Sequence, residues 1–157
     1  MGFIAGRYTA TYNALALGQT ADGFRLNWQL FGQEIRGDAF GQTVQDTVNQ
    51  GADMDLAARF IEYNAAAMAS AMWPLSATPW DMGVVGRLDV GSSIAKAIVL
   101  TAVSGTPAAA VPATMTLSLA SLKKGTPVEI LMAPALREVP LRFRIYPNSN
   151  GAFASQT

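Results

Sequence analysis

The chain has 157 residues, about the length of one domain, and its 11 Lys and Arg side chains balance its 11 Asp and Glu side chains. Because it contains no His and no Cys, metal sites of imidazole or thiolate, His-dependent nucleophilic catalysis and disulfides are excluded. Only 14% of the residues are charged and 50% are hydrophobic, so a monomer would expose apolar side chains that it cannot bury. This balance favours association between copies and argues against tight binding of bare nucleic acid.

No segment has the pattern of a signal peptide or of a membrane-spanning helix. The N-terminal stretch is interrupted by Arg7 and then alternates, and the uncharged stretch 97–122 contains Gly105, Pro107 and Pro112. We therefore expect a soluble, intracellular protein with no membrane partner.

The first half of the chain begins with strand patterns. Residues 7–13 and 24–30 alternate between apolar and polar side chains, with the period of two that is typical of a half-buried strand. Residues 33–51 hold three glycines and mixed charge, and we expect a long loop there, which is usually functional or disordered. Residues 54–63 fit a helix and a strand equally well, and a strand leading into a short helix is preferred.

One helix is predicted, from Asn64 to Trp73. This segment is rich in Ala and Met, Asn64 is suited to cap its first turn, and Pro74 ends it. Trp73 and Trp80 bracket a Pro-containing loop and are interpreted as packing anchors.

The second half is rich in strand patterns. Alternation predicts strands at 114–119 and 139–145, where Arg142 and Arg144 occupy the solvated face. Shorter strands are expected at 96–103 and 127–132, and Lys124-Gly125 signals a turn between two strands.

A single domain over residues 1–157 accounts for these elements. The pattern predicts an α+β fold that is mainly β, with two packed antiparallel sheets in a sandwich or barrel and one flanking α-helix. Residues 147–157 are expected to form an extended, poorly packed polar tail.

Catalytic motifs are weak. Ser93 and Lys96 have the SxxK spacing of serine acyl-transferases, but the companion motifs of those enzymes are missing. Asp53 and Asp55 would share one face of a strand, yet no spacing among the carboxylates singles out a glycosidase pair. We therefore expect no enzyme activity, no cofactor and no metal.

The order of turns in the first half carries a more specific pattern. Tyr12-Asn13, Leu17-Gly18-Gln19-Thr20 and Asp22-Gly23 precede a strand pattern, which is followed by Asp38, Phe40-Gly41-Gln42-Thr43, Asp46, Val48 and Gly51. This order resembles the tail tube proteins of long-tailed bacteriophages. Ala14 departs from the family, which has a turn glycine there, and the chain lacks the strong negative charge of many tube proteins.

The resemblance implies a virion structural protein that is assembled in the host cytoplasm. In that family two packed sheets and a flanking helix form a subunit, six subunits close a ring, and stacked rings form the tube through which genome DNA passes without specific binding. Sheath, terminator or baseplate proteins would be further partners, and a tail-tip or baseplate hub protein of the same fold stays an open alternative. The family's long loop contacts the next ring, which assigns that role here to Asp38, Phe40, Gly41, Thr43, Asp46 and Val48.

A tube also needs a channel wall. Thr114, Thr116 and Ser118 share the polar face of a predicted strand, and uncharged hydroxyl groups would offer a hydrated wall with little grip on phosphate. We therefore assign these three residues to the lumen. An alternative from another class is a soluble β-barrel that binds a small apolar ligand, a function that apolar faces ending in Trp28, Trp73 and Trp80 would suit.

Overall fold

The structure is a computed structural model that describes residues 7–62, 64–72, 88–103, 112–129 and 138–156. These residues form eight strands, one α-helix and one 3-10 turn. In chain order they are β1 (Tyr8–Tyr12), β2 (Leu15–Ala16), β3 (Thr20–Arg36), η1 (Asp38–Phe40), β4 (Val44–Phe60), α1 (Ala65–Met72), β5 (Lys96–Ala102), β6 (Thr114–Leu122), β7 (Val139–Tyr146) and β8 (Ala154–Gln156).

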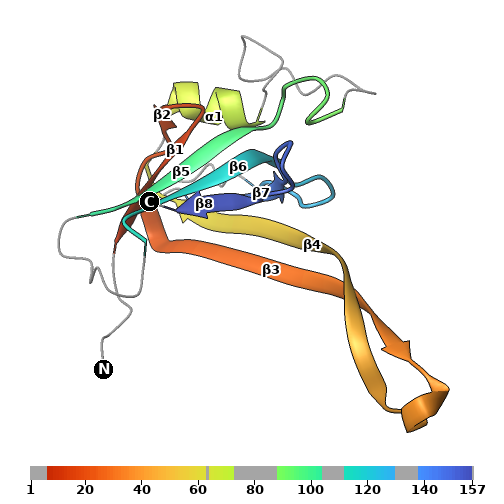
Figure 1. The fold of residues 1–157 in the computed structure, drawn as a ribbon. Helices are drawn as coiled ribbons and strands as arrows, with labels where there is room; N and C mark the ends of the chain where they lie inside the picture. Colours follow the sequence, from red (N-terminus) through yellow and green to blue (C-terminus); the bar gives the residue numbers. More distant parts are fainter. Residues whose placement is uncertain (1–6, 63, 73–87, 104–111, 130–137, 157) are drawn as a thin grey trace, which may run out of the picture.

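The described strands form one antiparallel sheet in the order β2-β1-β5-β6-β7-β4-β3 (Figure 1). The short strand β8 pairs with Met115–Leu117 of β6, and β7 pairs with the following stretch, Leu119–Leu122. The expectation of a mainly β, antiparallel fold is thus confirmed. Hydrogen bonds link all the described strands into a single sheet, so the strands are not divided into two separate sheets.

This sheet curls around one hydrophobic core. The rings of Tyr12 on β1 and Phe143 on β7 are stacked, although β5 and β6 separate these strands in the sheet. Every second residue of β1, β4 and β7 faces the core, as side chains alternate along a strand. A register shift between β5 and β6 interrupts this alternation on β6, where Leu117 and Ala120 are both buried. The buried side chains include Ala10, Tyr12, Leu56, Ala58, Phe60, Ile98, Leu100, Leu117, Ala120, Leu141, Phe143 and Ile145.

The helix α1 lies where the sequence predicts one. The Asn64 side-chain oxygen accepts a hydrogen bond of 3.2 Å from the backbone N–H of Ala67, as an N-cap residue does. Ala67 and Ala71 are buried in the core, and α1 contacts β1, β2 and β6. Its eight residues make a small contribution to a mainly β chain. The predicted packing anchors Trp73 and Trp80 lie outside the described residues.

The prediction of a long loop at 33–51 is wrong. Strands β3 and β4 have 17 residues each and pair from Thr20↔Phe60 to Arg36↔Val44, so only residues 37–43 connect them. The backbone groups of a hairpin satisfy each other whatever the side chains are, so glycines and mixed charge did not prevent strand formation. The preferred interpretation of 54–63, a strand leading into a helix, is confirmed.

The prediction of an extended, poorly packed tail at 147–157 is also wrong. The Asn148 side-chain oxygen accepts hydrogen bonds from the backbone N–H groups of Asn150 and Ala152, which turns the chain back onto β6. Phe153 packs against the core, and β8 follows it. The strand predicted at 127–132 is not formed over residues 127–129, and the rest of it lies outside the described residues.

Candidate functional site

The far half of the β3–β4 hairpin projects from the body, and we call residues 28–53 the arm. Strand β4 pairs with β7 only from Met54 to Phe60, and β3 pairs only with β4 among the described strands. Figure 1 shows the two strands of the arm running away from the rest of the sheet. An isolated two-stranded hairpin is at best marginally stable in water. The arm is therefore the part of the described fold with the greatest need of a partner.

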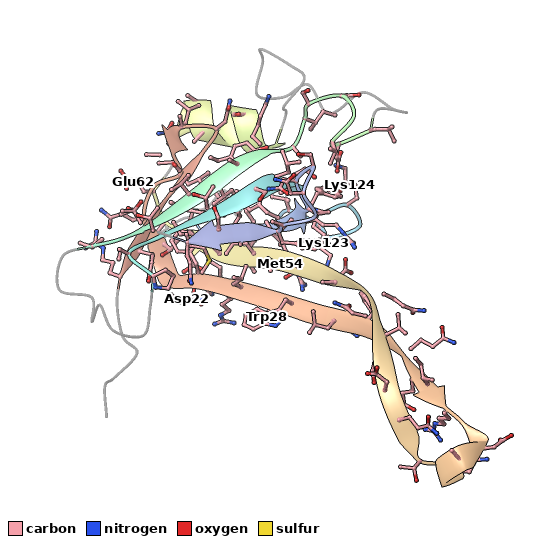
Figure 2. All side chains as sticks on the ribbon, viewed as in Figure 1. Asp22, Trp28, Met54, Glu62, Lys123 and Lys124 are labelled. Carbon is pink, nitrogen blue, oxygen red and sulfur yellow. The ribbon has the colours of Figure 1, made fainter. Side chains whose placement is uncertain are left out.

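Large apolar side chains are exposed along the arm. Trp28 and Leu30 occupy one face of β3, opposite Met54 and Ala52 of β4, and their exposed fractions are 63% and 68%. Figure 2 shows Trp28 on the stretch of β3 that leaves the body. Further exposed apolar side chains of the arm are Phe31, Ile35, Val44 and Val48. Exposed apolar side chains that lie next to one another on one face, as Trp28 and Leu30 do, are typical of a protein contact surface.

The end of the arm holds all six residues that the sequence assigned to an inter-ring contact, and we call residues 34–48 the arm tip. Asp38 and Phe40 belong to η1, Gly41 follows it, Thr43 precedes β4, and Asp46 and Val48 lie on β4. The φ of +66° and ψ of −136° at Gly41 are accessible to glycine alone, which explains the residue at this bend. The structure thus brings together residues that are spread over eleven positions of the sequence.

The arm tip is acidic. It contains three carboxylates and one arginine, and Arg36 pairs with Glu34 at 2.6 Å. Asp46 accepts a hydrogen bond of 2.7 Å from the backbone N–H of Thr47. Within the described part of the chain, neither Asp38 nor Asp46 has a cationic partner. The tip therefore presents two carboxylates that a cationic surface could pair.

The three predicted lumen residues lie on the side of β6 that faces away from the core. Thr114 is the cross-strand neighbour of Thr101 on β5, and Thr116 that of Ser155 on β8. The same face continues onto β1. We call this surface the hydroxyl face; its polar members are Thr9, Thr11, Thr101, Thr114, Thr116, Ser118 and Ser155. Ser118 also donates a hydrogen bond of 3.0 Å to the carbonyl of Ala152, so it helps to hold the C-terminal segment.

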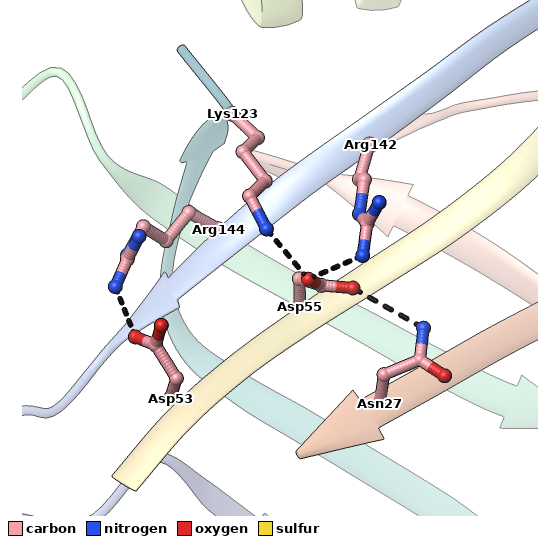
Figure 3. A network of polar contacts seen from close by, with 6 residues as sticks. All are labelled: Asn27, Asp53, Asp55, Lys123, Arg142 and Arg144. Carbon is pink, nitrogen blue, oxygen red and sulfur yellow. Dashed lines mark hydrogen bonds and ion pairs between the residues drawn. The ribbon is translucent and has the colours of Figure 1, made fainter. Parts of the chain in front are cut away.

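The outer surface of β3, β4 and β7 is charged instead. Asp55 accepts hydrogen bonds from Arg142 at 2.8 Å, Lys123 at 2.9 Å and Asn27 at 3.2 Å, and Arg144 pairs with Asp53 (Figure 3). Burial disfavours the Asp55 carboxylate, but these hydrogen bonds outweigh it and lower the pKa of Asp55 to about 2. The Asp55 carboxylate therefore stays ionised across the physiological range.

A cavity of about 230 Å³ opens on this charged surface, and we call it the basic pocket. Its lining includes four cations, Arg25, Arg59, Lys123 and Arg142, together with Asp22 and the segment Thr126–Val128. Arg25 and Arg59 both pair with Asp22, at 3.0 Å and 3.4 Å, and Arg59 also pairs with Glu138. The pocket therefore combines cationic side chains with a partly apolar wall.

Asp89 has a structural role near the end of β6. Its carboxylate accepts hydrogen bonds from Ser121 Oγ and Tyr146 OH, both at 2.7 Å, and from Lys124 Nζ at 2.5 Å. Burial again disfavours the charged form, but the hydrogen bonds outweigh it and the pKa of Asp89 is lowered. These contacts fasten the turn before β5 to β6 and β7.

A wider groove of about 970 Å³ lies between β1 and β3. Its apolar lining includes Phe24, Leu26, Leu56, Leu100 and Met115, and its rim is polar. This groove is the feature that a small apolar ligand would use.

The described residues contain no group of three or more His, Cys, Asp or Glu side chains placed to hold a metal ion. No helix in the described ranges is long and apolar enough to cross a membrane. Neither the models of known protein families nor the sequences of curated proteins match this chain.

The basic pocket is the feature that the sequence did not predict. Its cations come from three strands and the end of a fourth, which only the tertiary structure brings together. One signal was present in the sequence. Asp53 and Asp55 are two residues apart and share a face of β4, as predicted, and Arg142 and Arg144 share a face of β7 in the same way. Two such patterns of opposite charge indicate adjacent strands.

Proposed function

We propose that this chain is a bacteriophage virion structural protein, the subunit of a tail tube. Copies close into rings, expected to be hexameric, and the rings stack into the conduit for genome DNA ejection. The observation that carries the proposal is the arm, which projects from the body, exposes Trp28 and Leu30, and ends in the residues that match the family pattern. A second copy that packs against the arm would bury these exposed side chains and stabilise the hairpin.

The sheet offers a physical basis for ring closure. Its two ends are β2 with part of β1 on one side and β3 on the other, and each leaves backbone groups unpaired among the described strands. Joining the end of one copy to the opposite end of the next removes these exposed edges. Such a contact uses two different surfaces, and it forms a ring when the rotation closes.

In this proposal the curled sheet supplies both layers of the family's sandwich. Strands β1, β5 and β6 form one layer, β7, β4 and β3 form the other, and α1 is the flanking helix. The hydroxyl face would line the channel, because hydrated, uncharged groups hold phosphate weakly. The charged network around Asp55 would then lie away from the DNA.

Size-exclusion chromatography with negative-stain electron microscopy tests the proposal. Purified protein should form rings or tubes as its concentration is raised, and it should not turn over ester, glycoside or phosphate substrates. A tail-tip or baseplate hub protein of the same fold would stop at single rings. A stable monomer at high concentration, without particles, would contradict the proposal.

The groove between β1 and β3 favours a second candidate from another class, a carrier of a small apolar ligand. A carrier would remain monomeric and would bind an apolar fluorescent probe with one-to-one stoichiometry. Leu26→Glu, which places a charge in the groove at a side chain that is only partly buried, would abolish that binding.

A further inference from the structure

We infer that the basic pocket of one copy receives the arm tip of a second copy in the neighbouring ring. This inference rests on the proposed function, because it names the receptor for the arm in a stack of rings. The arm tip and the basic pocket are complementary in charge, and no contact within one copy can bring them together.

The basic pocket has cations that are short of anionic partners. Asp22 is shared by Arg25 and Arg59, and Asp55 is shared by Lys123 and Arg142. With Glu138, which also pairs with Arg59, four cations share three carboxylates. The Arg142 Nε is buried without a hydrogen-bond partner among the described residues. An incoming carboxylate would complete this pairing.

Access to the pocket is open on the side of β3. The side chain of Arg25 is 73% exposed, and that of Arg59 is 52% exposed. Both guanidinium groups can therefore reorient towards an arriving carboxylate. Guanidinium groups bind carboxylates in a directional, two-pronged geometry, which would fix the register of the contact.

The arm tip supplies the matching charge. Glu34 is already paired with Arg36, which leaves the carboxylates of Asp38 and Asp46. Exposed apolar side chains flank them at Ile35, Val44 and Val48. The pocket wall formed by Thr126–Val128 and Pro140 is partly apolar as well. The two surfaces are therefore opposite in charge, and both are partly apolar.

The geometry of the hairpin prevents the contact within one copy. Arg25 at the pocket and Arg36 at the tip lie on the same continuous strand, eleven residues apart. At roughly 3.3 Å per residue, this separates tip from pocket by up to about 36 Å. A second copy displaced along the arm by a similar distance would place its pocket at the tip of the first. Repeating that displacement produces an open stack.

Charge reversal tests the pairing in the full chain. One variant carries Arg25→Glu and Arg59→Glu, and the other carries Asp38→Lys and Asp46→Lys. We expect each variant alone to stack into tubes only at a protein concentration at least about tenfold higher than the wild type needs, because like charges then meet between rings. The equimolar mixture should assemble near the wild-type concentration, since each tip then finds a complementary pocket. So should the chain that carries all four changes.

Arg7→Glu is the matched control for Arg25→Glu alone, because it makes the same charge change at an exposed site outside the pocket. It should assemble as the wild type does. Arg25→Glu alone, paired with Asp38→Lys, repeats the test if the double variants fold poorly. Circular dichroism of each variant establishes that it is folded.

A cysteine pair tests the contact without changing charge. The chain has no Cys, so Thr43→Cys at the tip and Thr126→Cys at the pocket introduce the only thiols. Oxidised assemblies should give a ladder of covalent oligomers, whereas either single variant should give no ladder. Wild-type assembly without rescue by the charge swap, and without a ladder, would overturn the inference and leave the proposed function standing. Failure of the wild type to assemble would overturn both.

Discussion

The ring of Tyr12 on β1 stacks on the ring of Phe143 on β7, with the ring centroids 5.6 Å apart, although two strands lie between β1 and β7 in the sheet. Both side chains are fully buried, and the Tyr12 hydroxyl donates a hydrogen bond of 3.2 Å to the carbonyl of Ala120. Burial, with a smaller effect of the Asp89 charge, raises the pKa of Tyr12 to about 12. This pair therefore joins distant parts of the sheet across the core and stabilises the curled shape of the sheet.

Truncating Phe143 should destabilise the fold strongly. Phe143→Ala removes a buried ring and leaves a cavity, which costs about 3–5 kcal/mol. Arg144→Ala, one residue along but on the outer face, removes a solvent-exposed ion pair with Asp53 and should cost at most about 1 kcal/mol. Urea denaturation of both variants measures the difference. Equal effects would mean that the core does not depend on this contact.

Acid should weaken the fold through Asp55. Because the pKa of Asp55 is about 2 in the fold and 3.8 in the unfolded chain, the unfolded chain binds more protons between these values. The stabilisation by Asp55 is therefore complete above about pH 5 and is lost as the pH falls from about 4 to 2. We expect Asp55 to contribute about 1–2 kcal/mol to the free energy of unfolding, a figure that is already reduced for solvent screening.

Asp55→Asn should remove this part of the pH dependence and lower the stability at neutral pH. Glu129→Gln changes an exposed carboxyl outside the network and should leave the Asp55-dependent slope in place. Denaturant midpoints between pH 2 and pH 7 provide the measurement. An unchanged slope in Asp55→Asn would show that the ion pairs that Asp55 makes in Figure 3 do not contribute to stability.

The sequence predicted the strand faces better than it predicted how the strands continue. Local alternation was enough to place Tyr12 inwards and Arg142 outwards, because a packed core lies on one side of those strands. The arm has no core, so Gln33 and Val48 can be cross-strand neighbours and no apolar period appears. The return of the chain at Asn148 uses two backbone hydrogen bonds and two bonds to the Asn148 side-chain oxygen, a turn signal that the polar composition obscured.

Removing the end of the arm should separate folding from assembly. Gly32 and Asn49 are cross-strand neighbours, so replacing residues 33–48 by Asn-Gly closes a shorter hairpin with a favoured two-residue turn. The body should keep its melting temperature, because the buried core lies outside the deleted residues. Rings should still form, but they should not stack into tubes. Electron microscopy that showed normal tubes would remove the arm from the assembly contact.

Cations introduced on the hydroxyl face should make an assembled tube bind DNA. Thr114→Lys with Thr116→Lys leaves Ser118 and its bond to Ala152 intact, so we expect normal assembly. DNA should bind the altered tubes at low salt and be released as salt rises, because bound lysines displace counterions from phosphate. Thr114→Gln with Thr116→Gln is the uncharged control. Equal DNA retention by both variants, measured by co-sedimentation, would place these residues away from the channel.

An electron-microscopy reconstruction of the assembled protein tests the central claim most directly. The account predicts stacked rings around an open channel, with Thr114 and Thr116 on the channel wall and each arm reaching into the adjacent ring. Protein that stays monomeric at high concentration would contradict it. So would an assembly whose channel is lined by the charged network of Asp55 and Arg142, with the hydroxyl face on the outer wall.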